Sequence, residues 1–123
     1  MPRKKKKRIL VTGASGFLGL HLSQTLIESG ASVRTLGRTH SSRLEALGAE
    51  QKLGSILDSD TCLECLDSID EVYHLAGMVS RDPRDSGLLY DVHVKGTRNI
   101  LQGCLERGIE RVVTASTSGT VGV

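Results

Sequence analysis

Three glycines spaced three residues apart could bind a phosphate group near the start of this chain. They are Gly13, Gly16 and Gly19, in the stretch VTGASGFLG. An apolar run precedes this stretch and an amphipathic helical pattern follows it, which predicts a turn between a strand and a helix. Gly13 would permit the tight turn, Gly16 would let backbone N–H groups approach a pyrophosphate, and Gly19 would let the helix pack closely on the sheet. The alternative is a glycine-rich turn that binds nothing.

The end of the second predicted strand bears on which dinucleotide such a turn would bind. A site selective for NAD usually carries Asp or Glu there, hydrogen-bonded to the ribose hydroxyls. Here Gly37 occupies that position and Arg38 follows. The Arg38 guanidinium could pair with a 2′-phosphate through a bidentate contact, or it could be a solvated surface arginine. These residues favour NADP and leave NAD open.

Strand-like and helix-like segments alternate along the chain, which predicts an α/β fold. We expect strands at 8–13, 32–36, 50–56, 71–76 and 111–115, and helices at 17–29, 41–47, 58–66 and 88–107. Gly30, Gly48 and Gly108 follow three of these helices as C-caps. Right-handed crossovers then give a Rossmann-type, doubly wound parallel sheet of order 3-2-1-4-5. The sheet is expected to be incomplete at its C-terminal edge, because no helix follows the fifth strand.

The charge distribution separates a basic start from a mildly acidic body. Residues 3–8 are all Lys or Arg and supply six of the sixteen basic side chains, although the net charge is only +2. We expect residues 1–8 to be a disordered tail and residues 9–123 to be one dinucleotide-binding domain. The tail could instead contact nucleic acid, an acidic membrane surface or an import receptor.

Other composition features exclude several classes of partner. No basic face is interleaved with aromatic residues, so a nucleic-acid partner is not expected. No apolar run approaches the roughly 20 residues of a membrane span, which favours a cytoplasmic protein without membrane contact. The three cysteines, Cys62, Cys65 and Cys104, include a Cys-x-x-Cys pair inside a predicted helix. Further ligands at metal spacing are missing, so we expect free, partly buried thiols and no metal site.

Four segments together resemble the extended short-chain dehydrogenase/reductases, the NAD-dependent epimerase/dehydratase group. The chain has TGASGFLG at 12–19 for T-G-x-x-G-[FY]-[IL]-G, and HLAG at 74–77 for H-x-A-[AG]. It has VKGTRNIL at 94–101 for V-x-G-T-x-N-[LI]-L, and ASTSGTV at 115–121 near the family's S-S-[ST] segment. The resemblance covers the whole chain after the basic start.

The resemblance implies a set of site residues. Those expected to bind the cofactor are Gly13, Ser15, Gly16, Phe17, Leu18, Gly19, Arg38, Ser55, Ile56, Leu75, Ala76 and Gly77. Ser55 and Ile56 would line an adenine pocket, Ser55 standing where the family often has Asp. Asp58 is explained equally well as a helix N-cap. The hydroxyl that bonds the substrate oxygen would come from Ser118, then Thr117, then Ser116, unless these residues only satisfy their own backbone.

The resemblance also implies an activity, with two departures from the family pattern. The family transfers hydride between a nicotinamide and a carbon bearing a hydroxyl or carbonyl, on substrates such as nucleotide sugars, steroid-like alcohols or flavonoid-type ketones. Here His93 replaces the usual Asn of the helix motif, and no Tyr-x-x-x-Lys dyad is present. Tyr90 and Lys95 are five residues apart, about 140° around an α-helix, and so are not a substitute. We therefore expect the cofactor-binding part of an oxidoreductase or epimerase, with a possible homodimer. The alternative is a stand-alone dinucleotide-binding module or a catalytically dead fragment.

Overall fold

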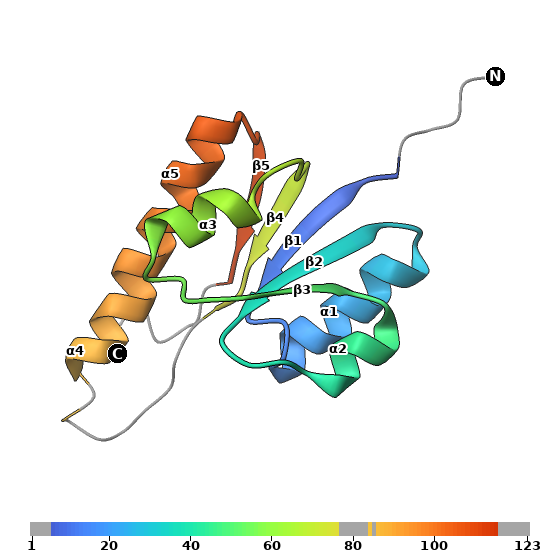
Figure 1. The fold of residues 1–123 in the computed structure, drawn as a ribbon, viewed down its shortest axis with the longest axis horizontal. Coiled ribbons are helices and arrows are strands. Elements are labelled where there is room, and N and C mark those ends of the chain that lie inside the picture. Colours follow the sequence, from blue (N-terminus) through green and yellow to red (C-terminus); the bar gives the residue numbers. More distant parts are fainter. Residues whose placement is uncertain (1–5, 77–83, 85, 116–123) are drawn as a thin grey trace, which may run out of the picture.

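The computed structural model describes residues 6–76, 84 and 86–115, whose strands form one parallel sheet (Figure 1). The strands are β1 (Arg8–Thr12), β2 (Ser32–Gly37), β3 (Glu50–Leu53), β4 (Glu71–His74) and β5 (Arg111–Thr114). Their order in space is β3-β2-β1-β4-β5, with every neighbouring pair parallel. The predicted order 3-2-1-4-5 is confirmed. The chain leaves β1 and β4 in opposite directions, which opens a crevice at their carboxyl ends.

Helices cover both faces of the sheet and make two separate apolar layers (Figure 1). The helices are α1 (Phe17–Glu28), α2 (Ser42–Leu47), α3 (Ser59–Cys65), α4 (Ser86–Tyr90), a π-helix (Asp91–Gly96) and α5 (Thr97–Arg107). Side chains of β1 alternate between the two layers, as the pleat of a strand requires. Ile9 and Val11 pack in the layer of α1 and α2, and Leu10 packs in the layer of α3 and α5. β1 is therefore the central, fully covered strand.

Four strands end earlier than expected at their carboxyl ends: β1 and β5 by one residue, and β3 and β4 by more. β4 ends at His74 instead of Ala76. Leu75 N still donates to the Thr12 carbonyl (3.2 Å), but the N–H groups of Leu75 and Ala76 also both donate to the Thr12 hydroxyl (3.0 Å each). β3 ends at Leu53 instead of Ile56, because a local turn follows, in which Asp58 N donates to the Ser55 carbonyl (3.1 Å). The predictions of longer strands at 50–56 and 71–76 were wrong at these ends.

The long helix expected over 88–107 begins at Ser86 and is interrupted by the π-helix. Two contacts, one at the last residue of the π-helix and one at the first residue of α5, fix the register of α5. Gly96 lies against Ile56, where an added Cβ would come within 3.0 Å of Ile56 Cγ2, and Thr97 Oγ1 lies 2.9 Å from His74 Nε2. A wider π turn accommodates the chain between α4 and these fixed points. The expectation of regular α-helix at Asp91–Gly96 was therefore wrong.

Helix ends follow the expected side-chain chemistry. Gly48 and Gly108 cap α2 and α5 with φ values of 85° and 71°, and Gly30 (φ 99°) follows Ser29, the C-cap of α1. Asp58 caps α3: its Oδ1 accepts N–H groups from Asp60 (3.0 Å) and Thr61 (3.3 Å). The N-cap interpretation of Asp58 is confirmed.

The basic start meets the sheet at its amino-terminal edge. Arg8 is the first residue of β1, and Lys7 Nζ lies 2.8 Å from a carboxylate oxygen of Glu71. Residues 1–5 of the expected tail lie outside the described residues. None of the helices in the described part of the chain is long and apolar enough to cross a membrane.

All three cysteines are buried free thiols, as predicted. They belong to the apolar layer of α3 and α5. Burial, with a smaller contribution from neighbouring Cys65, raises the pKa of the Cys62 thiol to about 12. Among residues 6–76, 84 and 86–115, His, Cys, Asp and Glu form no group of three that could hold a metal ion.

Candidate functional site

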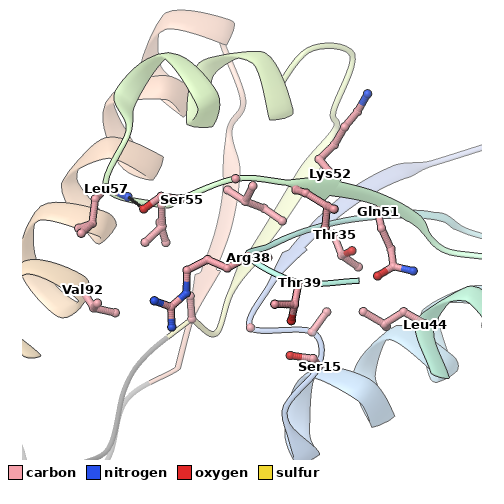
Figure 2. Close-up of a pocket in the computed structure, with 18 of the residues that line it drawn as sticks. Ser15, Thr35, Arg38, Thr39, Leu44, Gln51, Lys52, Ser55, Leu57 and Val92 are labelled. Carbon is pink, nitrogen blue, oxygen red and sulfur yellow. Dashed lines mark hydrogen bonds between the residues drawn. The ribbon is translucent and has the colours of Figure 1, made fainter. Parts of the chain in front are cut away.

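A cavity of about 220 Å³ lies at the carboxyl ends of β1, β2 and β3 (Figure 2). Its wall is formed by the glycine turn after β1, the loops after β2 and β3, and two residues of the α4 and π-helix segment, Leu88 and Val92. Six of the predicted cofactor-binding residues line it: Gly13, Ser15, Arg38, Ser55, Ile56 and Ala76. The tertiary structure thus brings four predicted segments, from Gly13 to Ala76, to one cavity.

The glycine turn needs glycine at two positions for reasons of packing. Gly13 has a φ of +68°, and a Cβ there would lie 2.7 Å from the carbonyl carbon of Leu75. A Cβ on Gly19 would collide with the Gly13 carbonyl oxygen and lie 2.7 Å from Ala14 Cα. Gly19 therefore packs on the turn itself, and not on the sheet as predicted.

The third glycine has no such packing requirement. Gly16 has extended backbone angles (φ −76°, ψ 173°), and a Cβ there would meet only the Gly13 carbonyl oxygen at an ordinary 3.5 Å. Gly16 is the N-cap of α1, and within the described part of the chain no side chain accepts a hydrogen bond from the first turn. The first N–H groups of a helix have no intrahelical partner. The fold thus leaves both space and backbone donors beside Gly16.

The two apolar residues that follow Gly16 do not line the cavity. The side chains of Phe17 and Leu18 are 85% and 59% exposed. The Phe17 ring makes an edge contact with the ring of His21, one turn further along α1. Only the backbone of Phe17 and Leu18 is placed to serve a ligand at the start of the helix.

Arg38 extends from the end of β2 to the side of the cavity formed by Ser55 and Val92 (Figure 2). Among the described residues, the Arg38 guanidinium makes no hydrogen bond or ion pair. The loop after it is held by Gln51, whose Oε1 accepts from Ser41 N (2.8 Å) and whose Nε2 donates to the Ser41 carbonyl (3.0 Å). Lys52, on the adjacent strand, also lines the cavity. The Lys52 ammonium points away from Arg38 in Figure 2 and lies 3.9 Å from a carboxylate oxygen of Glu50. Arg38 is therefore the cationic side chain that faces the cavity, and no described carboxylate lines it.

A chain of three side chains joins the floor of the site to α5. Thr12 Oγ1 accepts the N–H groups of Leu75 and Ala76, so its own proton points to His74 Nδ1, 2.8 Å away. His74 Nδ1 is then unprotonated, and Nε2–H donates to Thr97 Oγ1 at 2.9 Å. Burial, and to a smaller extent the charge of His93, lowers the pKa of His74. The His74 imidazole is thus neutral in the folded chain.

Four predicted site residues lie outside the described residues: Gly77, Ser116, Thr117 and Ser118. The 140° separation expected between Tyr90 and Lys95 was wrong, because Asp91–Gly96 is a π-helix. The π-helix bonds residue i to i+5, so this spacing no longer places two residues on different faces. In the structure, the Lys95 ammonium pairs with Asp91 (3.2 Å), and the side chain of Lys95 is more than half exposed.

Comparison with known proteins agrees with this geometry. The model of the NAD dependent epimerase/dehydratase family matches residues 9–123. The chain belongs to this family. It corresponds to the N-terminal part of the extended short-chain dehydrogenase/reductases, with their Rossmann-type sheet.

Relatives of this family member have varied names and greater lengths. Sterol demethylase protein B of Methylococcus capsulatus is 37% identical over 116 residues, which are 93% of this chain and 35% of that protein. A 3 beta-hydroxysteroid dehydrogenase/Delta 5-->4-isomerase of Mycobacterium tuberculosis is 32% identical, over 93% of this chain and 32% of that protein. The chain therefore spans about a third of the length of these relatives.

Solved structures of the family superpose well on the described fold. A short-chain dehydrogenase/reductase superfamily protein from Agrobacterium tumefaciens, with bound NAD, has a TM-score of 0.81 and 31% identity, covering 89% of this chain and 32% of that one. A UDP-glucose 4-epimerase from Thermotoga maritima, with UDP-glucose, has a TM-score of 0.81 and 28% identity, covering 91% of this chain and 38% of that one.

Several residues that shape the site were not predicted to do so. Gln51, Thr12, Thr97, Gly96 and Asn99 fix the loops and helices around the cavity. Three of them, Gly96, Thr97 and Asn99, belong to the VKGTRNIL motif. The motif was therefore a usable signal, although its spacing alone does not reveal which partner each side chain contacts.

Proposed function

We propose that this chain is the dinucleotide-binding part of an oxidoreductase or epimerase that transfers hydride to or from a hydroxyl- or carbonyl-bearing substrate. One observation carries the proposal: the open space and unpaired N–H groups beside Gly16 adjoin a cavity bordered by Arg38, Ser55 and Ile56. A pyrophosphate fits the backbone donors at the start of α1, since a helix N-terminus favours negative charge. The adenosine end of the same ligand fits the cavity.

The size of the cavity supports a site that holds only the adenosine end of the dinucleotide. Pockets for whole drug-sized ligands have roughly 300–1000 Å³. The cavity has about 220 Å³, and its lining includes Gly13, Ala14 and Ser15, just before Gly16. This suits one nucleoside, with the remainder of the ligand extending past Gly16. A bound nicotinamide dinucleotide would supply the hydride chemistry, and the residues described here would bind and orient its adenosine and pyrophosphate.

We further propose a preference for NADP over NAD. Arg38 follows Gly37, which stands where an NAD-selective site carries a carboxylate, and no described carboxylate lines the cavity. A guanidinium that has no partner among residues 6–76, 84 and 86–115 is suited to a 2′-phosphate, which offers it charge-assisted hydrogen bonds. NAD is bound in the similar solved structure from Agrobacterium tumefaciens, so NAD is the competing ligand to test.

The relatives guide the proposed substrate class. Proteins named for sterols or hydroxysteroids are among those similar to this chain, and nucleotide-sugar enzymes share its fold. A hydroxyl from Ser118 or Thr117 would bond the substrate oxygen, as the family pattern implies. The general acid/base is not among the described residues. Turnover would distinguish an enzyme from a stand-alone dinucleotide-binding module.

The deciding experiment is calorimetric titration of the chain with NADPH, NADH and 2′,5′-ADP. Saturable binding of NADPH, tighter than binding of NADH, is the expected result. Binding of NADH at least as tight as that of NADPH would overturn the proposed NADP preference and leave the dinucleotide site. Failure of all three ligands to bind would overturn the proposed function.

Assembly and location complete the proposal. The outward surface of α5 and the segment before it carries exposed apolar side chains at Val94, Leu101 and Leu105, the last 82% exposed. We propose that a second copy of the chain packs there, and that Leu105→Glu shifts the sedimentation coefficient from that of a dimer to that of a monomer.

We also propose a location in a reducing compartment such as the cytoplasm, because the three cysteines are free thiols.

A further inference from the structure

We propose that Asn99 is a positioning residue for the adenosine end of the cavity, acting through the backbone of Ile56. This inference rests on the proposed function. Asn99 does not line the cavity, yet its Nδ2 donates a hydrogen bond of 3.0 Å to the Ile56 carbonyl oxygen. The two residues are 43 positions apart in the sequence. The bond therefore joins α5 to a loop that forms one wall of the cavity.

The loop carrying Ile56 is otherwise held mainly by short-range bonds. Gly54 N donates to the Gly37 carbonyl (2.9 Å), which continues the pairing of β3 with β2 by one residue. Leu57 N donates to Ser55 Oγ (3.1 Å), and Asp58 N donates to the Ser55 carbonyl. These last two bonds close a turn within the loop. They do not fix how that turn is placed against the rest of the fold.

Hydrogen bonds from α3 and α5 to a single atom hold the turn in place against the rest of the fold. The Ile56 carbonyl oxygen accepts both Asn99 Nδ2 and the thiol of Cys62 (3.3 Å). The carbonyl is therefore turned toward the two helices, while the residue as a whole still contributes to the cavity wall. A carboxamide N–H is the stronger of the two donors, since a thiol is a weak one.

The π-helix that precedes α5 also restricts the position of the Ile56 side chain. Gly96 approaches it so closely that an added Cβ would lie 3.0 Å from Cγ2 and 3.2 Å from Cγ1. Val92, about one turn earlier, lines the same cavity as Ile56 and lies on the side of Leu57 (Figure 2). Backbone and side chain of Ile56 are thus both set by one continuous segment from Val92 to Asn99. Movement of this segment would change the cavity wall.

The experiment compares binding of 2′,5′-ADP, which carries the adenosine end alone, by the full chain and by Asn99→Asp and Asn99→Leu. Asn99→Asp keeps the shape but turns a donor into an oxygen facing the Ile56 carbonyl, and Asn99→Leu removes the donor without adding charge. Both should weaken 2′,5′-ADP binding by about tenfold, the effect expected for loss of one buried hydrogen bond.

A stability-matched control separates positioning from general loosening. Val33→Ala removes buried volume in the other apolar layer, away from Ile56, and should lower the melting temperature without changing 2′,5′-ADP affinity by more than about twofold. Equal losses of affinity in Val33→Ala and Asn99→Leu would overturn the positioning role. Unchanged affinity in both Asn99 variants would also overturn it. If the unmodified chain binds no 2′,5′-ADP, the proposed function fails together with this inference.

Discussion

The Thr12 hydroxyl lies 2.8 Å from His74 Nδ1, and this hydrogen bond joins the carboxyl ends of β1 and β4 directly beneath the glycine turn. Both side chains are at least 95% buried. Thr12 also accepts two backbone N–H groups of the chain leaving β4, so one hydroxyl holds both the chain after β4 and the imidazole. His74 in turn reaches Thr97 at the start of α5. The floor of the site and the helix bordering it are thus one hydrogen-bonded unit.

This unit predicts a loss of stability in mild acid. The pKa of His74 is lowered in the folded state by burial, so below its ordinary value of 6.5 the unfolded chain takes up a proton more readily than the folded one. Stability should be fully present above about pH 6.5 and decrease as the pH falls below it. Urea unfolding midpoints between about pH 7.5 and about pH 5.5 measure the effect.

His74→Gln is the control for the acid effect, because it removes the titrating group. It should lower stability at neutral pH and flatten the dependence on pH in this window. The same slope in the variant and the unmodified chain would assign the effect to other groups.

Glu50 affects stability in a separate pH window. Its pKa is lowered mainly by its hydrogen bond to Arg34, so its contribution to the stability of the fold is lost below about pH 4.5.

Two glycine substitutions should have opposite effects on binding and stability. Gly16→Val should abolish NADPH binding while changing the melting temperature little, because the fold leaves room for a side chain that would occupy the pyrophosphate position. Gly19→Ala should lower the melting temperature strongly, since its Cβ would collide with the Gly13 carbonyl. Calorimetry and thermal unfolding test both. Tight NADPH binding by a folded Gly16→Val protein would contradict the site assignment.

Replacing Arg38 should discriminate between the two dinucleotides. Arg38→Ala should weaken NADPH binding by about 1–3 kcal/mol, the value of a hydrogen bond to a charged group, and NADH binding far less. Arg43→Ala, which removes an exposed arginine outside the cavity lining, should leave both affinities unchanged. Equal losses for NADPH and NADH in Arg38→Ala would rule out a contact with the 2′-phosphate.

The cysteines should be unreactive until the chain unfolds. Burial raises the pKa of all three thiols, that of Cys62 to about 12, so the nucleophilic thiolate is scarce near neutral pH. Ellman's reagent should label none of them quickly in the native protein and all three in denaturant. Rapid labelling of the native chain would show that the layer of α3 and α5 opens readily.

Much of the architecture followed from local patterns in the sequence. The run before Gly13, the glycine spacing and the helical stripe after it predicted β1, the turn and α1 correctly, because each depends on residues close together in the chain. The sheet order followed from the alternation of strands and helices and from the handedness of crossovers. Asp58, Gly48 and Gly108 were also correctly interpreted as helix caps.

Long-range contacts decided what local patterns could not. At the end of β4, the hydroxyl of Thr12, 63 positions before Leu75, accepts the next two N–H groups. The π-helix before α5 accompanies the contacts of Gly96 with Ile56 and of Thr97 with His74. Asn99 contacts the cavity wall from a different helix. Sequence periodicity reports which face of an element is buried. It does not report which partner lies opposite, and at this site the partners set the helix register and the shape of the cavity.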